Sequence, residues 1–259
     1  MTATTRSRLT PDQRRSQLLE LGVRLLATRS LDELSIDVLA EEAGISRGLL
    51  YHYFGNKHAF HEAVVRRAAD DLIAQTAPPA DGDPLVRLMV SLAAYVDYVL
   101  ANFEGYVSLL KGAGGGNDAL RAIYEEVRGV LSDRIFTEDP EGHLIADTPR
   151  NRLVVRGWSA MTEELVITWG ADQRAGRTQV SRDELLAIIG GSLPALVGPQ
   201  PPPAAADPAA RGKGKQAGSG AQSGAGSGAG SGAESGAESG AESGAESPAA
   251  ILLRDEQLR

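Results

Sequence analysis

The chain has 259 residues, of which 42% are hydrophobic, and this length and composition provide apolar side chains for a sizeable core in one or two domains. It contains no cysteine, which excludes disulfides, thiolate nucleophiles and cysteine-ligated metals. The formal net charge of −8 argues against attraction of nucleic acid over the whole surface, but residues 1–76 carry equal numbers of basic and acidic side chains, whereas residues 77–198 carry 11 basic and 17 acidic ones.

Helix-start signals mark four helices in the first third of the chain. The predicted N-cap residues are Thr10, Ser35, Ser46 and Asn56. The helices that follow them are predicted over about residues 11–28, 36–43, 47–53 and 57–75. Gly44, directly after the second helix, stands where a left-handed residue ends a helix.

The second part of the chain also reads as helical. Apolar periodicity predicts helices over about residues 84–101, 103–111, 118–135, 151–169 and 182–197, with a loop at 136–149. No segment alternates as a strand would, so the fold class is all-α. From Pro199 onward the sequence repeats Ser-Gly-Ala and Ser-Gly-Ala-Glu, which offers almost no side chain to bury and predicts a disordered, low-complexity tail over 199–259.

The most informative segment is residues 35–57, SIDVLAEEAGISRGLLYHYFGNK, which predicts a helix-turn-helix. Its apolar positions, which pack the two short helices on their neighbours, are Ile36, Leu39, Ala40, Ile45 and Leu50. The second short helix is then held outward, where its free face fits a major groove about 12 Å wide. On that face Arg47 can donate two hydrogen bonds to guanine, Gly48 permits close approach, and Tyr51 and His52 supply donors and flat rings.

Residues 12–75 resemble the DNA-binding domain of the TetR family of regulators. The matching pattern is Leu39-Ala40, Ala43-Gly44-Ile45-Ser46, Leu50-Tyr51-His52-Tyr53-Phe54 and Asn56-Lys57. The resemblance implies a subunit of about nine helices: an N-terminal three-helix helix-turn-helix domain at 10–76 and a ligand-binding and dimerisation domain at 77–198, with the tail beyond. It further implies a homodimer formed by helices eight and nine, a pseudopalindromic double-stranded operator, and repression released by a small molecule.

Site residues carry over from the family position by position. Arg47, Gly48, Leu49, Tyr51 and His52 match base-facing or groove-facing positions, and Ser35, Ile36, Tyr53 and Lys57 match phosphate-side positions. Asp37 departs from relatives that place an arginine there, and because a carboxylate cannot bind phosphate we expect no contact from it. Arg6 and Arg8 of the N-terminal arm are candidates for electrostatic attraction to DNA.

The ligand pocket and the dimer seam have candidates in the second domain. Pocket candidates are Leu88, Tyr95, Tyr98, Phe103, Tyr106, Leu109, Trp158 and Met161, for each of which plain core packing is the alternative. Seam candidates are Gly157, Trp158, Leu185, Ile188 and Ile189, for which packing within the chain is the alternative. Such a pocket suits an apolar or aromatic ligand, such as a fatty acyl chain, an aromatic antibiotic or a drug, and the acidic balance of the domain favours cationic or neutral ones.

Three patterns that could indicate a metal site, a phosphate-binding loop or a catalytic carboxylate pair are incomplete in this sequence. His58 and His61 share a helix face without a third ligand, so we expect surface histidines and no metal. Residues 112–116 are glycine-rich but lack the strand and lysine of a phosphate loop, so they predict a helix stop and a loop. Glu163 and Glu164 are adjacent, point to different sides of a helix, and are expected in solvent or at an interface. We expect no catalytic residue, no cofactor and no enzyme.

The sequence thus favours a sequence-specific DNA-binding transcription regulator, a repressor released by a small-molecule ligand. The alternative is a helical ligand-binding or protein-interaction module without operator binding, which the acidic second domain and the long tail favour. The N-terminus lacks the apolar run of a secretory signal, and no stretch of about 18 uninterrupted apolar residues predicts a membrane span. A cytoplasmic location is therefore expected.

Overall fold

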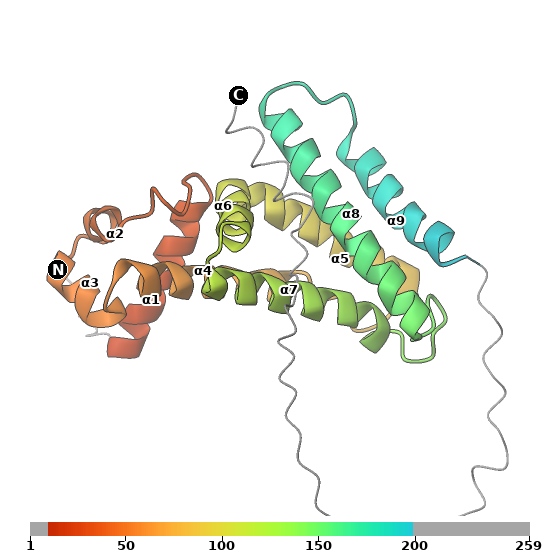
Figure 1. Ribbon diagram of the computed structural model, residues 1–259, viewed down its shortest axis with the longest axis horizontal. Coiled ribbons are helices and arrows are strands. Elements are labelled where there is room, and N and C mark those ends of the chain that lie inside the picture. The colour runs from red at the N-terminus through yellow and green to blue at the C-terminus, as the bar shows by residue number, and fades with distance from the viewer. Residues whose placement is uncertain (1–9, 199–259) are drawn as a thin grey trace, which may run out of the picture. The chain divides into compact units, whose positions relative to one another are not determined.

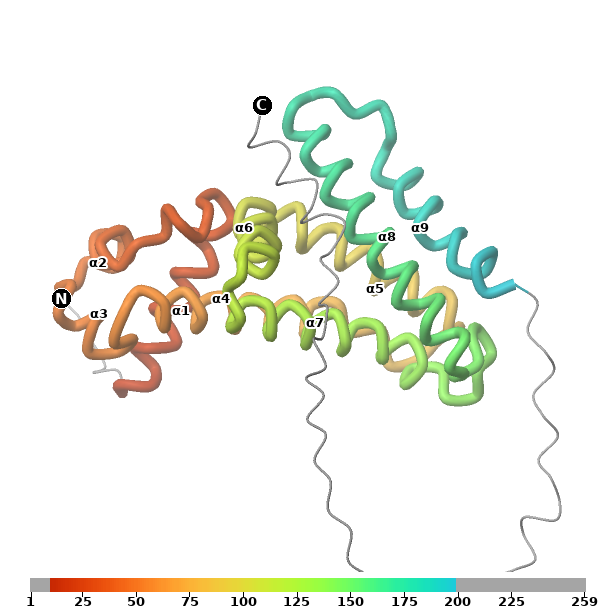
Figure 2. Tube along the Cα trace, viewed as in Figure 1, coloured from red at the N-terminus to blue at the C-terminus, as the bar shows by residue number. Residues whose placement is uncertain are grey.

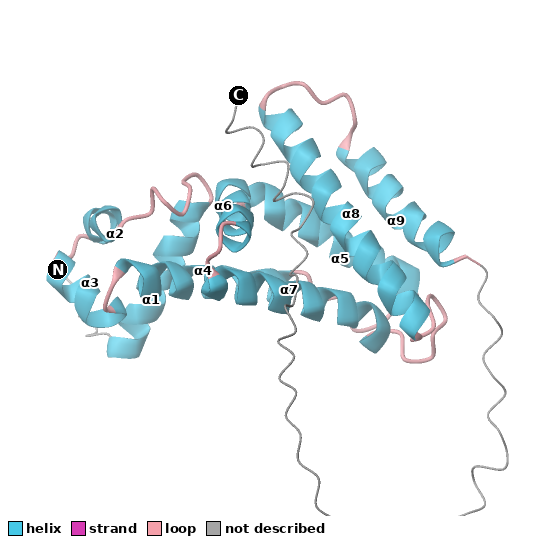
Figure 3. Cartoon of the chain, in the orientation of Figure 1, coloured by secondary structure: helices cyan, strands magenta, loops and turns pink. Residues whose placement is uncertain are grey.

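The computed structural model describes residues 10–198, and this part of the chain consists of α-helices and loops without strands (Figures 1 and 3). Its helices are α1 (Pro11–Leu26), α2 (Ile36–Ala43), α3 (Arg47–Phe54), α4 (Lys57–Gln75), α5 (Pro84–Ala101), α6 (Phe103–Gly114), α7 (Asp118–Thr137), α8 (Pro149–Arg174) and α9 (Arg182–Val197). The predicted all-α class is confirmed. The predicted tail at 199–259, and Arg6 and Arg8, lie outside the described residues.

Side-chain caps begin the first four helices at the predicted residues. The Oγ1 of Thr10 accepts from the backbone N–H of Gln13 at 3.2 Å, and the Oε1 of Gln13 accepts from the N–H of Thr10 at 2.9 Å. Ser35, Ser46 and Asn56 each accept from the N–H three residues further on, at 3.1, 3.3 and 2.9 Å. Each cap satisfies a backbone donor that a helix leaves without a partner, so these residues determine where the helices start.

The turn between α2 and α3 is short because of one glycine. Gly44 has a φ of 63°, in the left-handed region, and its N–H donates to the carbonyls of Ala40 and Glu41. Ile45, which follows it, is half-buried and packs against the core below. The turn therefore holds α2 and α3 at a fixed angle on α1 and α4, which lie next to them at the red-to-orange end of the chain in Figure 2.

One hydrophobic core supports the helix-turn-helix. Leu34, Leu39, Leu50 and Phe60 are fully buried in it, and burying a side chain of this size contributes roughly 1.5–3 kcal/mol. The same core also contains residues of α5 and α7, namely Tyr98, Leu120, Ile123 and Val127. Side chains from both sides of the predicted boundary between residues 76 and 77 therefore share one core. A displacement of α5 or α7 can reach α2 and α3 through this packing.

A second core lies among α5, α8 and α9. Val96, Val155 and Ile189 are fully buried in it. The indole Nε1 of Trp158 on α8 donates to the carbonyl of Ile189 on α9 at 3.0 Å, which joins the two long helices. These helices run side by side in Figure 1.

Two helices extend beyond their predicted ends for identifiable reasons. α6 continues through Gly112 to Gly114, so the predicted stop at residue 111 is wrong. A Cβ on Gly112 would lie 2.5 Å from the Cδ1 of Leu120, so this glycine permits α6 and α7 to pack closely. α8 begins at Pro149 because Thr148 caps it through the N–H of Asn151 at 3.1 Å, a start signal that the sequence reading did not use.

α5 is the one described helix that is long and apolar enough, by length and composition, to cross a membrane, with a mean hydropathy of 1.5. It carries two charged side chains that bind other elements of the same domain. The Arg87 guanidinium pairs with Glu138, and the Asp97 carboxylate pairs with Arg182 of α9 at 2.7 Å. α5 also packs against α4, α6, α8 and α9, and its Val96, Tyr98 and Val99 side chains are buried there.

Candidate DNA interface and ligand cavity

The outward face of α3 is open in the described part of the chain. Arg47, Gly48 and His52 are exposed, and 50% of the Tyr51 side chain is accessible. Leu50 and Phe54 point the other way and are buried, with the Phe54 ring 5.2 Å from the ring of Phe60. A helix anchored on one side and polar on the other is the arrangement that lets side chains reach base edges.

Arg47 is held by a carboxylate of the neighbouring helix. Its Nε lies 2.6 Å from the Oδ1 of Asp37 on α2, and both side chains are more than half exposed. From the sequence we expected no DNA contact from Asp37, because a carboxylate cannot bind phosphate. The pair places a negative charge beside the first residue of α3 and restricts the direction of its guanidinium.

The predicted phosphate-side residues differ in accessibility. Lys57 is exposed at the first position of α4, where free backbone N–H groups also point outward. Ser35 and Tyr53 are half-buried, as is Leu49 on the groove side. Ile36 is only 4% exposed and belongs to the core, so its side chain does not face DNA, and only its backbone N–H at the start of α2 remains available.

Of the two histidines on α4, His61 is not at the surface, contrary to the prediction. It is 9% exposed, and its Nε2 lies 2.6 Å from the carbonyl oxygen of Leu34 in the segment before α2. Burial lowers the pKa of His61 below its usual value of 6.5, since desolvation disfavours the charged ring. His58 is exposed, and no group of His, Asp and Glu in residues 10–198 is arranged to hold a metal ion.

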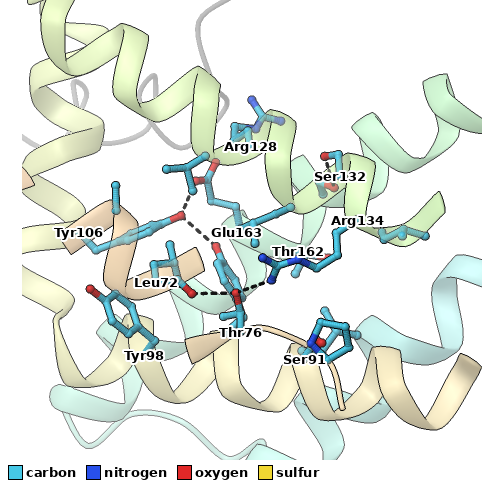
Figure 4. Close-up of a pocket in the computed structure, with 18 of the residues that line it drawn as sticks. Leu72, Thr76, Ser91, Tyr98, Tyr106, Arg128, Ser132, Arg134, Thr162 and Glu163 are labelled. Carbon is cyan, nitrogen blue, oxygen red and sulfur yellow. Dashed lines mark hydrogen bonds between the residues drawn. The ribbon is translucent and has the colours of Figure 1, made fainter. Parts of the chain in front are cut away.

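A cavity of about 160 Å³ lies among α1 and α4 to α8 (Figure 4). Predicted pocket residues on its wall are Leu88, Tyr95, Tyr98, Tyr106, Leu109 and Trp158. Phe103 and Met161 are not on the wall: Phe103 is buried with the Arg174 guanidinium 4.2 Å from its ring centre, and Met161 packs against the second core. Most of the wall is apolar, with a few polar groups at defined places, as in small-molecule sites.

The main polar feature of the cavity is a hydrogen-bonded network of side chains from four helices, α5, α6, α7 and α8. The Tyr106 hydroxyl donates to Glu163 Oε1 at 2.7 Å, and the Tyr124 hydroxyl donates to Oε2 at 2.6 Å. The Tyr95 hydroxyl lies 2.9 Å from that of Tyr106. Glu163 is 3% exposed, so the expectation that it lies in solvent or at an interface was wrong. Burial raises the pKa of Tyr95 and of Tyr106, and both hydroxyls therefore keep their protons.

Comparison with known proteins identifies the family. The family model of bacterial regulatory proteins of the tetR family matches residues 18–64. The crystal structure of a tetR-family transcriptional regulator from Streptomyces coelicolor is similar with a TM-score of 0.64 and 31% identity, over 73% of this chain and 82% of that one. The chain belongs to the TetR family. A transcriptional regulator from Rhodococcus, at 17% identity and a TM-score of 0.54 over 71% of this chain and 98% of that one, shares the fold.

Curated relatives match part of this TetR-family chain. The HTH-type transcriptional activator FasR of Mycolicibacterium smegmatis is 30% identical over 102 residues, which cover 39% of this chain and 47% of that protein. The HTH-type transcriptional regulator BetI of Burkholderia thailandensis is 36% identical over 87 residues, which cover 32% and 45%. The chain thus spans about half the length of the curated relatives it matches.

Several predicted seam residues of this TetR-family chain instead pack within the subunit. Trp158, Leu185 and Ile189 are at most 3% exposed, because α8 and α9 pack on each other through them. Ile188 is 52% exposed, and Gly157 is exposed on α8. Periodicity places these residues on helix faces, but it does not say which face meets the subunit's own core.

Proposed function

We propose that this TetR-family chain is a transcription regulator that binds double-stranded operator DNA through α3 as a homodimer, and that it is a repressor released by a small molecule. The observation that carries the proposal is the open polar face of α3, supported from behind by Leu50 and Phe54. This role needs binding and no catalysis, and it places the protein in the cytoplasm with its DNA.

Contacts to DNA divide by position. Arg47, Tyr51 and His52 on the face of α3 reach base edges, where an arginine makes its most specific contact with guanine. A Cβ on Gly48 would meet no other atom of residues 10–198 within 4 Å, so the helix can approach the groove closely at this position. Lys57 and the N–H groups at the starts of α2 and α4 contact phosphates, which position the protein without reading sequence.

The exposed surface of α8 and α9 supports the homodimer. Leu153 is 73% exposed, Ile188 52% and Leu196 49%, which is unusual for side chains of this size on a free surface. Gly157 lies on the same side of α8 as Leu153, four residues further on, and lets a second backbone approach. A two-fold dimer would present two α3 helices to half-sites about 34–36 Å apart.

The cavity supports control by a ligand. Its wall includes Val23 and Leu26 of α1 and Leu72 of α4, so its contents contact the helices that hold α3. A ligand that fits better when the two α3 helices have the wrong spacing for DNA would shift the population away from the DNA-binding form. A ligand with equal affinity for both forms would leave repression unchanged.

Selection of bound sequences from a random DNA pool, followed by mobility shifts, tests the proposal. We expect a pseudopalindromic consensus, and the variants Tyr51→Ala and Lys57→Ala should weaken binding while the circular-dichroism melt stays nearly unchanged. Glu125→Ala on the exposed side of α7 is the matched control. Failure to enrich any sequence at modest salt would contradict operator binding and favour a ligand-binding or interaction module.

The homodimer has a separate test. Ile188→Asp places a charge on the exposed face of α9 without disturbing the core, because the side chain is 52% exposed. We expect a monomer by light scattering and loss of tight operator binding. A variant that remains dimeric, together with Leu196→Asp also remaining dimeric, would show that the dimer forms elsewhere.

A further inference from the structure

The hydrogen-bonded chain in the cavity has a definite count of protons. Tyr106 has one hydroxyl hydrogen and gives it to the Glu163 carboxylate, and Tyr124 gives its own to the other carboxylate oxygen. Tyr106 can therefore take part in its 2.9 Å contact with Tyr95 only as acceptor, so the hydrogen of Tyr95 is used there. The hydroxyl hydrogens of the three tyrosines are therefore all used in hydrogen bonds among Tyr95, Tyr106, Tyr124 and Glu163.

These hydrogen-bonded side chains can therefore offer a ligand hydrogen-bond acceptors and no hydroxyl donors. Tyr95 keeps oxygen lone pairs on the cavity wall, and each oxygen of a carboxylate can accept more than one hydrogen bond. The hydroxyls of Tyr106 and Tyr124 contact the carboxylate, and the Tyr95 hydroxyl contacts that of Tyr106, so the polar end is lined by oxygen atoms. A ligand head group that donates hydrogen bonds or carries positive charge is complementary to this end of the cavity, whereas a carboxylate or phosphate head group is not.

A second feature of the cavity points to a polar group of the ligand. Within residues 10–198 the Thr162 hydroxyl has no hydrogen-bond partner, although the residue is only 4% exposed and lies on the cavity wall next to Glu163 in the chain. The Ser91 hydroxyl on α5 is also buried, on the wall and without a partner in that range. Buried hydroxyls are nearly always hydrogen-bonded, so the unpartnered Thr162 hydroxyl indicates a site that a ligand completes.

Two of the arginines on the wall, Arg134 and Arg87, are already bound to protein groups. Arg134 donates to the Thr76 hydroxyl at 3.2 Å (Figure 4) and to the carbonyl of Ile73 at 3.0 Å. Arg87 pairs with Glu138. Arg128 lies with its guanidinium carbon 5.4 Å from the centre of the Tyr124 ring. An anionic head group at Arg134 or Arg87 would have to take the guanidinium from these partners, and this makes anion binding at those two arginines less favourable than cation binding at Glu163.

We propose that the cavity binds a primary-amine amphiphile, with its ammonium group at Glu163, Tyr95 and Thr162 and its apolar part along the aliphatic wall. The aliphatic wall consists of Leu72, Leu88, Leu92, Leu109, Val127 and Leu131. A primary ammonium has three N–H donors, and the oxygen atoms of Glu163, Tyr95 and Thr162 can accept them. The aliphatic wall buries the alkyl chain of the ligand. The assignment rests on the proposed role of the cavity as the effector site, and it names the chemistry of the effector.

Isothermal titration of the full chain with octylamine, octanol and octanoate tests the proposal, since these probes share one chain and differ in the head group. We expect octylamine to bind roughly tenfold or more tightly than octanol, in line with the strength of charge-assisted hydrogen bonds, and octanoate to bind weakest. Octanoate binding as tightly as octylamine, or no binding of any probe, would overturn the proposal. The titration needs no DNA, so operator binding measured in parallel tests the proposed function independently.

The variant Glu163→Gln localises the effect. It removes the negative charge at nearly constant shape, and we expect octylamine to lose its advantage over octanol, whereas Glu125→Gln on the exposed side of α7 keeps it. A Glu163→Gln protein that folds and retains the full preference for octylamine would contradict the site. If that variant does not fold, Thr162→Val should lower the affinity for octylamine more than the affinity for octanol. An equal loss of affinity for both probes would contradict the proposed ammonium site.

Discussion

Asp37 is expected to tune DNA recognition through Arg47, and the variant Asp37→Asn isolates this effect. The substitution keeps the shape of the side chain and removes the charge that lies 2.6 Å from the Arg47 Nε. Two consequences follow. A negative charge disappears from the surface that approaches phosphates, and the guanidinium loses the partner that directs it.

The structure sets the size of both consequences. The two side chains are 69% and 54% exposed, so the pair contributes only about 0.2–1 kcal/mol to folding, and the melting temperature should stay nearly constant. A directed arginine–guanine contact discriminates against the wrong base by about 1–3 kcal/mol. We expect Asp37→Asn to lose about 1 kcal/mol of that discrimination, a roughly fivefold change in the ratio of affinities, and to bind random DNA more tightly.

Fluorescence anisotropy with the selected operator, single-base variants of it and random duplex measures these quantities at fixed salt. Glu41→Gln, at an exposed position of α2 four residues after Asp37, is the matched control, because it removes the same charge from the same helix and leaves the Asp37–Arg47 pair in place. The control should raise affinity for random DNA without changing base discrimination. Equal discrimination in wild type and Asp37→Asn would refute the idea that Asp37 directs Arg47.

Two further outcomes are expected from the fold. Leu50→Ala, at a fully buried position, should lower the free energy of unfolding by about 2–5 kcal/mol in urea titrations, and a loss below about 1 kcal/mol would contradict the packing beneath α3. The folded pKa of His61 lies below its unfolded value of 6.5, so the unfolded chain takes up the proton first as pH falls, and the stability from the neutral ring declines below about pH 6.5. His61→Asn should reduce this decline relative to wild type in melts between about pH 7 and 5.5, and an identical pH profile would show that His61 does not contribute.

Local signals predicted the helices well where the chain supplies its own caps. Ser46 marks the start of α3 and Asn56 marks the start of α4, because a side-chain acceptor beside free backbone donors is a feature of neighbouring residues alone. The face of α3 was also readable, since Leu50 was predicted to pack on the neighbouring helices and is buried, opposite the exposed Arg47 and Tyr51. The burial of Phe54 was not predicted.

Contacts between distant segments were not readable in the same way. Glu163 looked like one member of an exposed pair, because its partners Tyr106 and Tyr124 come from two other helices. His61 looked exposed for the same reason, since its partner is the carbonyl of Leu34, 27 residues away. Ile189 was assigned to a dimer seam because periodicity does not distinguish two apolar surfaces of one helix.

The central claim is that the outward face of α3 touches base pairs of a specific duplex, and site-directed crosslinking tests it most directly. The chain contains no cysteine, so His52→Cys introduces a single thiol on that face, and Glu125→Cys introduces one on α7 as the control. With the selected operator carrying a disulfide tether on a major-groove base, we predict a crosslink at position 52 and none at position 125. Equal yields at both positions, or no crosslink at position 52 for any tethered base of the operator, would contradict the account.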